Sequence, residues 1–133
     1  MYLLDTNICI YIINNRPQHQ HVLYKLNEFK IGNMAISSIT ASELAFGAQK
    51  SARKKQNIEV LDSLFEILEI LPYNYKAISH YARIRQYLEA SGKIIGELDM
   101  LIAAHAISLD MVLVTNNTKE FSRIKGLKLE NWV

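Results

Sequence analysis

The chain has 133 residues, half of them hydrophobic, which is enough for one domain with one core over residues 1–133. Its formal net charge of +2 permits contact with a nucleic acid, although no polybasic tail by itself indicates one. The apolar runs are too short for a transmembrane helix, and Asp5 interrupts the segment where a signal peptide would be apolar, so we expect a cytoplasmic protein without membrane contact.

The N-terminal half of the sequence alternates between strand and helix patterns. Residues 2–4 form an apolar run that predicts a strand, and the polar triplet at 5–7 marks the start of a short helix that continues to residue 13. Cys9, the only cysteine, is expected to be buried among the isoleucines of that helix and to be chemically inert. Apolar spacing then predicts a helix over 22–29, a strand over 34–37, a helix over 40–49, a helix over 58–68 and a strand over 69–71.

The C-terminal half continues the alternation. A long helix is predicted over 75–88, a second helix over 99–109, the clearest buried strand over 111–115, a short helix around Phe121 and a last strand over 127–129. Gly92 follows the long helix, where glycine commonly ends helices. Strands that alternate with helices predict a parallel sheet covered on both faces, so the expected fold class is α/β with three layers.

Three acidic residues follow the predicted strands. Asp5 comes directly after the first strand, Glu43 lies in the first turn of the helix after the second strand, and Asp99 begins a later helix. Ligands of open parallel sheets bind beyond the carboxyl ends of the strands, where these acids would meet. Three carboxylates in one crevice repel one another unless a cation neutralises them, and hard oxygen ligands suit Mg²⁺ or Mn²⁺.

The same acids also fit a purely structural interpretation. Asp is a preferred N-cap, and Thr40 and Glu43 have the spacing of a capping box. For each acid taken alone this interpretation is the stronger, because every helix needs caps whereas metal sites are few. Amide substitutions separate the two, since Asn and Gln serve at caps but do not replace an anionic metal ligand.

Four segments, at residues 1–10, 36–48, 95–106 and 113–121, contain in turn LLDTN, TASELAFG, GELDMLIAAHA and VTNNTKEF. In order and spacing they resemble the PIN-domain ribonucleases and, within them, the VapC toxins of type II toxin–antitoxin pairs. The resemblance extends over essentially the whole chain. It implies a PIN-like fold, with a central, mostly parallel sheet flanked by helices, and a divalent-metal-dependent endoribonuclease.

Position by position, the resemblance implies that Asp5, Glu43 and Asp99 are the catalytic, metal-binding acids, with Mg²⁺ or Mn²⁺ as the cofactor. The family's fourth acid falls on Asn117, which the resemblance places among the catalytic residues. Because Asn117 is neutral, this departure weakens the expectation of a full second metal site. Glu120 or Glu97 could compensate for it. Supporting roles are expected for neighbouring polar residues, namely Thr6, Asn7, Glu97, Thr115, Asn116 and Glu120.

The resemblance also implies partners. The substrate would be RNA, specifically tRNA and the anticodon region of initiator tRNA, cut by a metal-activated water. A VapB-type antitoxin would bind the chain and alone mediate contact with operator DNA, and a second copy would complete a homodimer. A basic cluster provides candidates for phosphate contacts, with a solvated helix connection as the evenly weighted alternative; it consists of Lys50, Arg53, Lys54 and Lys55.

Two other functions compete with the ribonuclease. A catalytically silent PIN-like module that binds only RNA or a protein remains open, because Asn117 is neutral. A receiver-like domain needs a phosphoacceptor Asp after the third strand, where this chain has Leu71, Pro72 and Tyr73.

Overall fold

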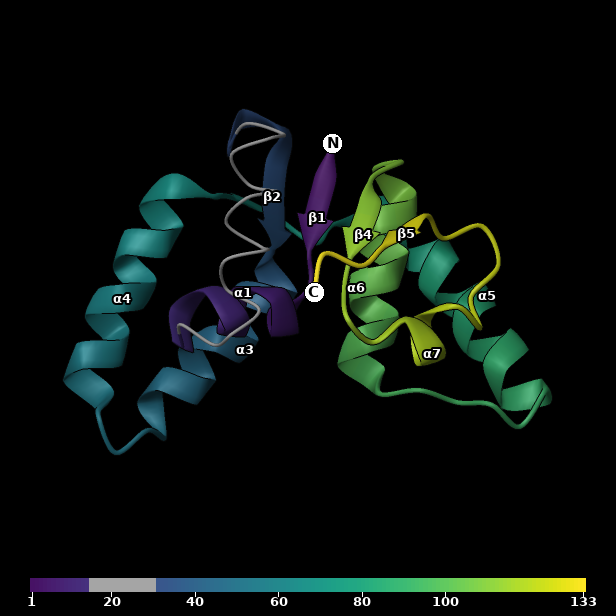
Figure 1. The fold of residues 1–133 in the computed structure, drawn as a ribbon. Helices are drawn as coiled ribbons and strands as arrows, with labels where there is room; N and C mark the ends of the chain where they lie inside the picture. The colour runs from purple at the N-terminus through teal and green to yellow at the C-terminus, as the bar shows by residue number, and fades with distance from the viewer. Residues whose placement is uncertain (15–30) are drawn as a thin grey trace.

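A five-stranded parallel sheet forms the centre of the computed structural model, which describes residues 1–14 and 31–133 (Figure 1). The strands lie in the order β3-β2-β1-β4-β5, and every neighbouring pair is parallel. Their bounds are β1 (Tyr2–Leu4), β2 (Met34–Ser37), β3 (Glu69–Leu71), β4 (Val112–Val114) and β5 (Leu129–Glu130). The helix predicted over 22–29 lies outside the described residues.

Helices cover both faces of this sheet. Their bounds are α1 (Thr6–Asn14), α3 (Ser38–Gln49), α4 (Lys54–Ile67), α5 (Ile78–Ala90), α6 (Glu97–Ser108) and α7 (Thr118–Phe121), with 3₁₀ turns η1 (Ile31–Asn33) and η2 (Tyr75–Ala77). Successive strand residues point to opposite faces, so Leu3 joins the apolar core with α5 and α6, whereas Leu4 joins the core with α1, α3 and α4. Figure 1 shows the resulting three layers, and the predicted α/β fold is confirmed.

The central strands are apolar because both of their faces are covered. Met34, Ala35 and Ile36 in β2 are buried, as are Leu3 and Leu4 in β1. In the described part of the chain, no helix is long and apolar enough to span a membrane.

Several element boundaries differ from the sequence prediction. Helix α3 begins at Ser38 and not at residue 40, because the Ser37 side chain accepts the Ile39 N–H at 3.0 Å and acts as the N-cap. The helix predicted over 75–88 is divided into η2 and α5. Strand β5 lies later than predicted, since Leu129 and Glu130 are the residues that pair with β4.

Candidate active site

The sequence-predicted acids line one groove beyond the carboxyl ends of the strands. Helices α1 and α3 begin there, directly after β1 and β2 (Figure 1). The groove has a volume of about 740 Å³ and brings together Asp5, Glu43 and Asp99. The other described residues that line it are Thr6, Asn7, Ile10, Ile39, Ser42, Phe46, Gly47, Lys50 and Leu98.

Asp5 is the most deeply held of the three acids. Its N–H donates to the Val114 carbonyl at 2.9 Å, which extends the β1–β4 pairing to the groove. One carboxylate oxygen accepts the Thr6 N–H at 2.8 Å and the other accepts the Thr115 hydroxyl at 2.7 Å. Burial raises the pKa of Asp5, these two hydrogen bonds lower it in part, and the charge of Glu43 raises it further. The two hydrogen bonds therefore hold the Asp5 carboxylate in one orientation, and no positive charge is among the causes that set its pKa.

Glu43 lies one turn further into its helix than the sequence predicts. Because Ser37 is the N-cap of α3, the predicted capping box of Thr40 and Glu43 is wrong, and Thr40 is a buried helix residue whose Oγ1 has no hydrogen-bond partner among the described residues. The Glu43 carboxylate instead accepts the Thr6 hydroxyl at 2.8 Å, across from α1. The side chain thus points toward the groove and does not cap its own helix.

Asp99 is not the N-cap of α6, although the sequence places it at the helix start. Gly96 is the N-cap, and Asp99 follows in the first turn, half-buried. Burial raises the pKa of Asp99 to about 6, with further contributions from the charges of Asp5, Glu43 and Glu120. These three carboxylates are therefore close enough to Asp99 for their charges to oppose its ionisation.

The polar residues after β4 connect this strand to the site. The Thr115 hydroxyl accepts the Asn117 N–H at 3.0 Å while it donates to Asp5. The Asn117 side-chain amide donates to the Glu120 carboxylate at 3.3 Å. Asn116 donates to the Tyr11 hydroxyl at 2.7 Å, and its own Oδ1 is buried without a hydrogen-bond partner among the described residues. Asn117 thus holds Glu120, and Asn116 keeps one acceptor free.

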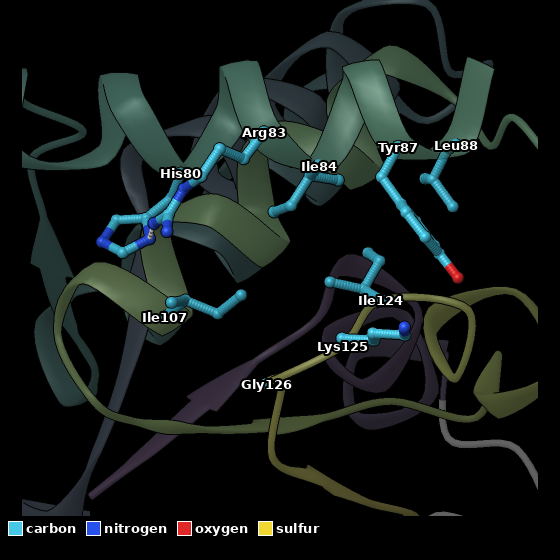
Figure 2. A pocket seen from close by; sticks show the side chains of 9 residues that line it. All are labelled: His80, Arg83, Ile84, Tyr87, Leu88, Ile107, Ile124, Lys125 and Gly126. Atoms are coloured by element: carbon cyan, nitrogen blue, oxygen red, sulfur yellow. Dashed lines mark hydrogen bonds between the residues drawn. The ribbon is translucent and has the colours of Figure 1, made fainter. Parts of the chain in front are cut away.

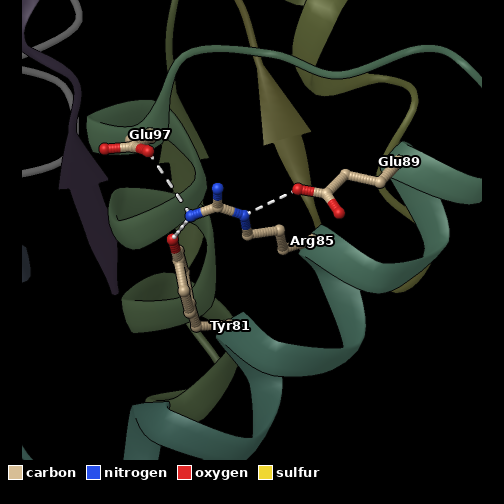
Figure 3. A network of polar contacts seen from close by, with 4 residues as sticks. All are labelled: Tyr81, Arg85, Glu89 and Glu97. Carbon is tan, nitrogen blue, oxygen red and sulfur yellow. Dashed lines mark hydrogen bonds and ion pairs between the residues drawn. The ribbon is translucent and has the colours of Figure 1, made fainter.

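Glu97, the other candidate to replace the fourth acid, faces away from the groove. Figure 3 shows it beside Arg85, whose guanidinium lies 3.4 Å from the Glu97 carboxylate. Arg85 also contacts Glu89 at 2.9 Å and the Tyr81 hydroxyl at 2.8 Å, so this network joins α5 to the start of α6. The structure therefore brings Glu120, and not Glu97, into electrostatic contact with Asp99.

The donor set of the groove fits a hard divalent cation. Carboxylate oxygens are the ligands that Mg²⁺ and Mn²⁺ prefer, and the mutual repulsion around Asp99 is what a cation would relieve. Among the described residues, no three His, Cys, Asp or Glu side chains stand close enough to hold one ion in their present positions. A cation in this groove would therefore contact fewer than three of these side chains directly in their present positions and would take its other ligands from water.

The basic cluster divides between the groove and the surface. Lys50 lines the groove, and its ammonium group lies 5.1 Å from the centre of the Phe46 ring. Arg53 precedes α4, and Lys54 and Lys55 begin that helix, all three exposed and outside the groove lining.

Sequence reasoning missed Phe46 and Leu98. Both line the groove with exposed apolar side chains, although apolar residues at helical spacing normally suggest a core. The signal that could have found Phe46 is its position three residues after Glu43, which puts both on one face of α3.

His105 is a buried link between the two helices that carry Glu43 and Asp99. Its ring lies 2.8 Å from the hydroxyl of Ser37, the N-cap of α3, and packs edge-on against Tyr73. Burial lowers the pKa of His105. The ring is thus a structural contact between α6 and α3, in agreement with its predicted place away from Asp99.

A second cavity, of about 410 Å³, lies between α5 and the loop before β5 (Figure 2). No carboxylate is among the described residues that line it, so it offers no metal-binding chemistry of the kind found in the first groove. Its lining is His80, Arg83, Ile84, Tyr87, Leu88, Ile107, Ile124, Lys125 and Gly126.

Comparison with known proteins identifies the family. The sequence profile of the PIN domain matches residues 2–127. This chain belongs to the PIN-domain family. Ribonuclease VapC2 of Haemophilus influenzae (strain ATCC 51907 / DSM 11121 / KW20 / Rd) is 46% identical over 132 residues, which cover 99% of this PIN-domain chain and 98% of that protein. The tRNA(fMet)-specific endonuclease VapC of Shigella flexneri is 40% identical over 131 residues, covering 98% and 97%.

Solved structures agree with this family. The DNA-bound VapBC of Salmonella typhimurium matches with a TM-score of 0.93 at 41% identity and covers 99% of this chain and 98% of that one. VapBC2 of Rickettsia felis, bound to a DNA fragment from its promoter, matches with a TM-score of 0.89 at 45% identity and the same coverage. Within the PIN-domain family, the chain therefore belongs with the VapC ribonucleases, as the four sequence segments predicted.

Proposed function

We propose that this PIN-domain protein is the toxin of a type II toxin–antitoxin pair and an endoribonuclease that hydrolyses phosphodiester bonds of tRNA, with initiator tRNA as the preferred substrate. The observation that carries the proposal is the groove in which Asp5, Glu43 and Asp99 meet beside Lys50. Carboxylates that repel one another call for a cation, and a lysine beside them suits a phosphate. The relatives named as ribonucleases and tRNA(fMet)-specific endonucleases support the substrate class.

The proposed metal ligands are Asp5, Glu43 and Asp99, with Mg²⁺ or Mn²⁺ as the ion and Glu120 in place of the family's fourth acid. A bound divalent cation supplies an activated water and offsets negative charge at the phosphate. In this proposal the hydroxyls of Thr6 and Thr115 orient the carboxylates to which they donate.

The site also explains a neutral Asn117. Its amide donates to Glu120, so the position serves to hold a carboxylate and does not itself supply one. Asn7 and Asn116 are proposed as further polar contacts, since Asn7 lines the groove and the Asn116 Oδ1 has no hydrogen-bond partner within the described part of the chain.

The proposed partners follow from the solved relatives. Structures of VapBC complexes support a VapB-type antitoxin as the binding partner of this chain, and those that contain DNA support operator contact through the antitoxin. We further propose that the chain forms a homodimer, that residues 1–133 are a single domain and that the protein is cytoplasmic.

Cleavage of RNA by amide variants tests the function. We expect the wild-type chain to cut initiator tRNA only with added Mg²⁺ or Mn²⁺, and Asp5→Asn and Asp99→Asn to lose about two orders of magnitude or more in rate, because an amide does not replace an anionic ligand. Asp62→Asn, an exposed acid of α4 outside the groove, is the matched control and should cut at the wild-type rate.

The same experiment tests the second candidate function. A catalytically silent module is favoured only by the neutral Asn117, and it would bind RNA without metal-dependent cleavage. RNA binding by the wild-type chain without metal-dependent cleavage would refute the proposed ribonuclease. Wild-type rates in both groove variants, measured on folded proteins with unchanged circular dichroism spectra, would refute Asp5 and Asp99 as its metal ligands.

A further inference from the structure

We propose that Phe46, Gly47 and Lys50 form a subsite in which one unpaired base of the RNA stacks on the Phe46 ring while the adjacent phosphate pairs with Lys50. This inference rests on the proposed ribonuclease function and deepens it. It assigns a nucleobase position to the part of the groove lined by the C-terminal half of α3. The following contacts on helix α3 support it.

The Phe46 side chain is largely exposed and borders the groove. It is 65% exposed and lines the groove that contains Glu43, three residues earlier on the same helix face. Single exposed apolar side chains are common on protein surfaces, so it is the position of this ring beside the candidate catalytic acids that supports a ligand-binding role. Every nucleobase presents a flat face that an aromatic ring can stack on.

Lys50 makes a cation–π contact with the Phe46 ring. Its ammonium group lies over the Phe46 ring, 5.1 Å from the centroid, one helical turn beyond Phe46. The cation lies over a ring that is 65% exposed, so a positive charge and an accessible aromatic surface are side by side. A stacked base and its neighbouring phosphate need these two features together.

Gly47 provides the space. It lies inside α3, where glycine disfavours a helix, and a Cβ added there would meet no atom of residues 1–14 or 31–133 within 4 Å. Packing therefore gives no reason for a glycine at this position. Because Gly47 lines the groove next to Phe46, the missing side chain keeps the floor of the subsite open.

The charged and polar side chains of the groove favour RNA over a purely apolar protein segment. Of the twelve described residues that line it, seven are polar or charged, among them the three candidate catalytic acids. An apolar partner would bury these groups without compensation, whereas a nucleotide supplies phosphate and base edges to Lys50, Asn7 and Ser42.

Binding of a fluorescent RNA tests the subsite. The probe is a single-stranded RNA that contains 2-aminopurine, whose fluorescence is quenched by stacking, measured with the full chain carrying Asp5→Asn to prevent cleavage. We expect Phe46→Leu in this background to weaken binding about fivefold or more and to lose the quench, since Leu keeps apolar bulk but cannot stack. Lys50→Gln should weaken binding and reduce its salt dependence while it retains the quench.

Tyr75→Leu is the matched control, because Tyr75 is 75% exposed on η2 and lies outside the groove. It should bind the probe like the parent. Unchanged affinity and quench in Phe46→Leu would overturn the subsite. If Phe46→Leu instead weakened self-association or antitoxin binding and left RNA binding intact, the ring would serve a protein interface and the subsite would again be wrong. Loss of cleavage by the wild-type chain would refute the ribonuclease, whereas the binding measurement judges the subsite independently.

Discussion

At the scale of single residues, the groove keeps acidic side chains where burial and like charge oppose their ionisation. Asp5 is 2% exposed and Asp99 is half-buried, and the charges of Glu43 and Glu120 add to the effect of burial on Asp99. Such an arrangement destabilises the folded chain in the absence of a cation. The free energy of unfolding of this protein should therefore change when the charge of these carboxylates changes.

Asp99→Asn should stabilise the metal-free protein at neutral pH. The folded-state pKa of Asp99, about 6, lies above the value of 3.8 for an unperturbed Asp. The folded state therefore binds the proton more tightly, and its stability falls as the pH rises from about 4 through 6. We expect the variant to melt several degrees above the wild type at pH 7.5 in EDTA. At pH 4 the two proteins should melt at the same temperature.

Added Mg²⁺ provides the control for this prediction. An ion that binds only the folded state raises the melting temperature, so Mg²⁺ should stabilise the wild type and have less effect on Asp99→Asn. Equal melting temperatures of the two proteins in EDTA at pH 7.5 would contradict the repulsion inferred around Asp99.

At the scale of elements, hydrogen bonds between elements decide which side chains reach the groove. The Ser37 cap sets the start of α3, and Thr6 at the start of α1 reaches across to Glu43 on that helix. Sequence patterns placed the strand, the helix and the acid correctly but assigned the cap to Thr40, because Ser37 also reads as a strand residue. The helix start was decided by which hydroxyl met the Ile39 N–H.

Two glycines provide an element-scale prediction, because a Cβ at either would meet none of the described residues within 4 Å. Gly47 is inside a helix, so Gly47→Ala should stabilise the fold by about 0.5–1 kcal/mol. Gly92 has a φ of +68° at the end of α5, so Gly92→Ala should be destabilising. Urea unfolding monitored by circular dichroism compares the two, and stabilisation by both or by neither would contradict the backbone argument.

At the scale of the whole molecule, the sheet unites two cores, and the C-terminus completes one of them. Trp132 is 2% exposed, packs in the core of α1, α3 and α4, and lies beside Tyr2 with ring centroids 5.3 Å apart. Its indole N–H donates to the Glu130 carboxylate at 3.0 Å. The last residues of the chain thus support the strand that delivers Asp5.

Trp132→Ala should cost about 3–5 kcal/mol of unfolding free energy, because it leaves a large cavity between β1 and the helices. Chemical denaturation followed by far-ultraviolet circular dichroism measures the loss, since the chain has no other tryptophan for fluorescence. Tyr75→Ala, at an exposed aromatic, is the control and should stay within about 0.5 kcal/mol of the wild type. A similar cost in both variants would contradict the assigned core position.

The sequence by itself determined the alternation of strands and helices, the parallel sheet and the candidate acids Asp5, Glu43 and Asp99, because periodicity and the polar residues after strands are local properties. Only the tertiary structure decided that Glu120 faces Asp99 while Glu97 pairs with Arg85, and that Phe46 is exposed in the groove. Neighbouring residues on a helix point in different directions. The packing of α6, α7 and α3 decides which of their side chains point into the groove. Composition and spacing carry no information about that packing.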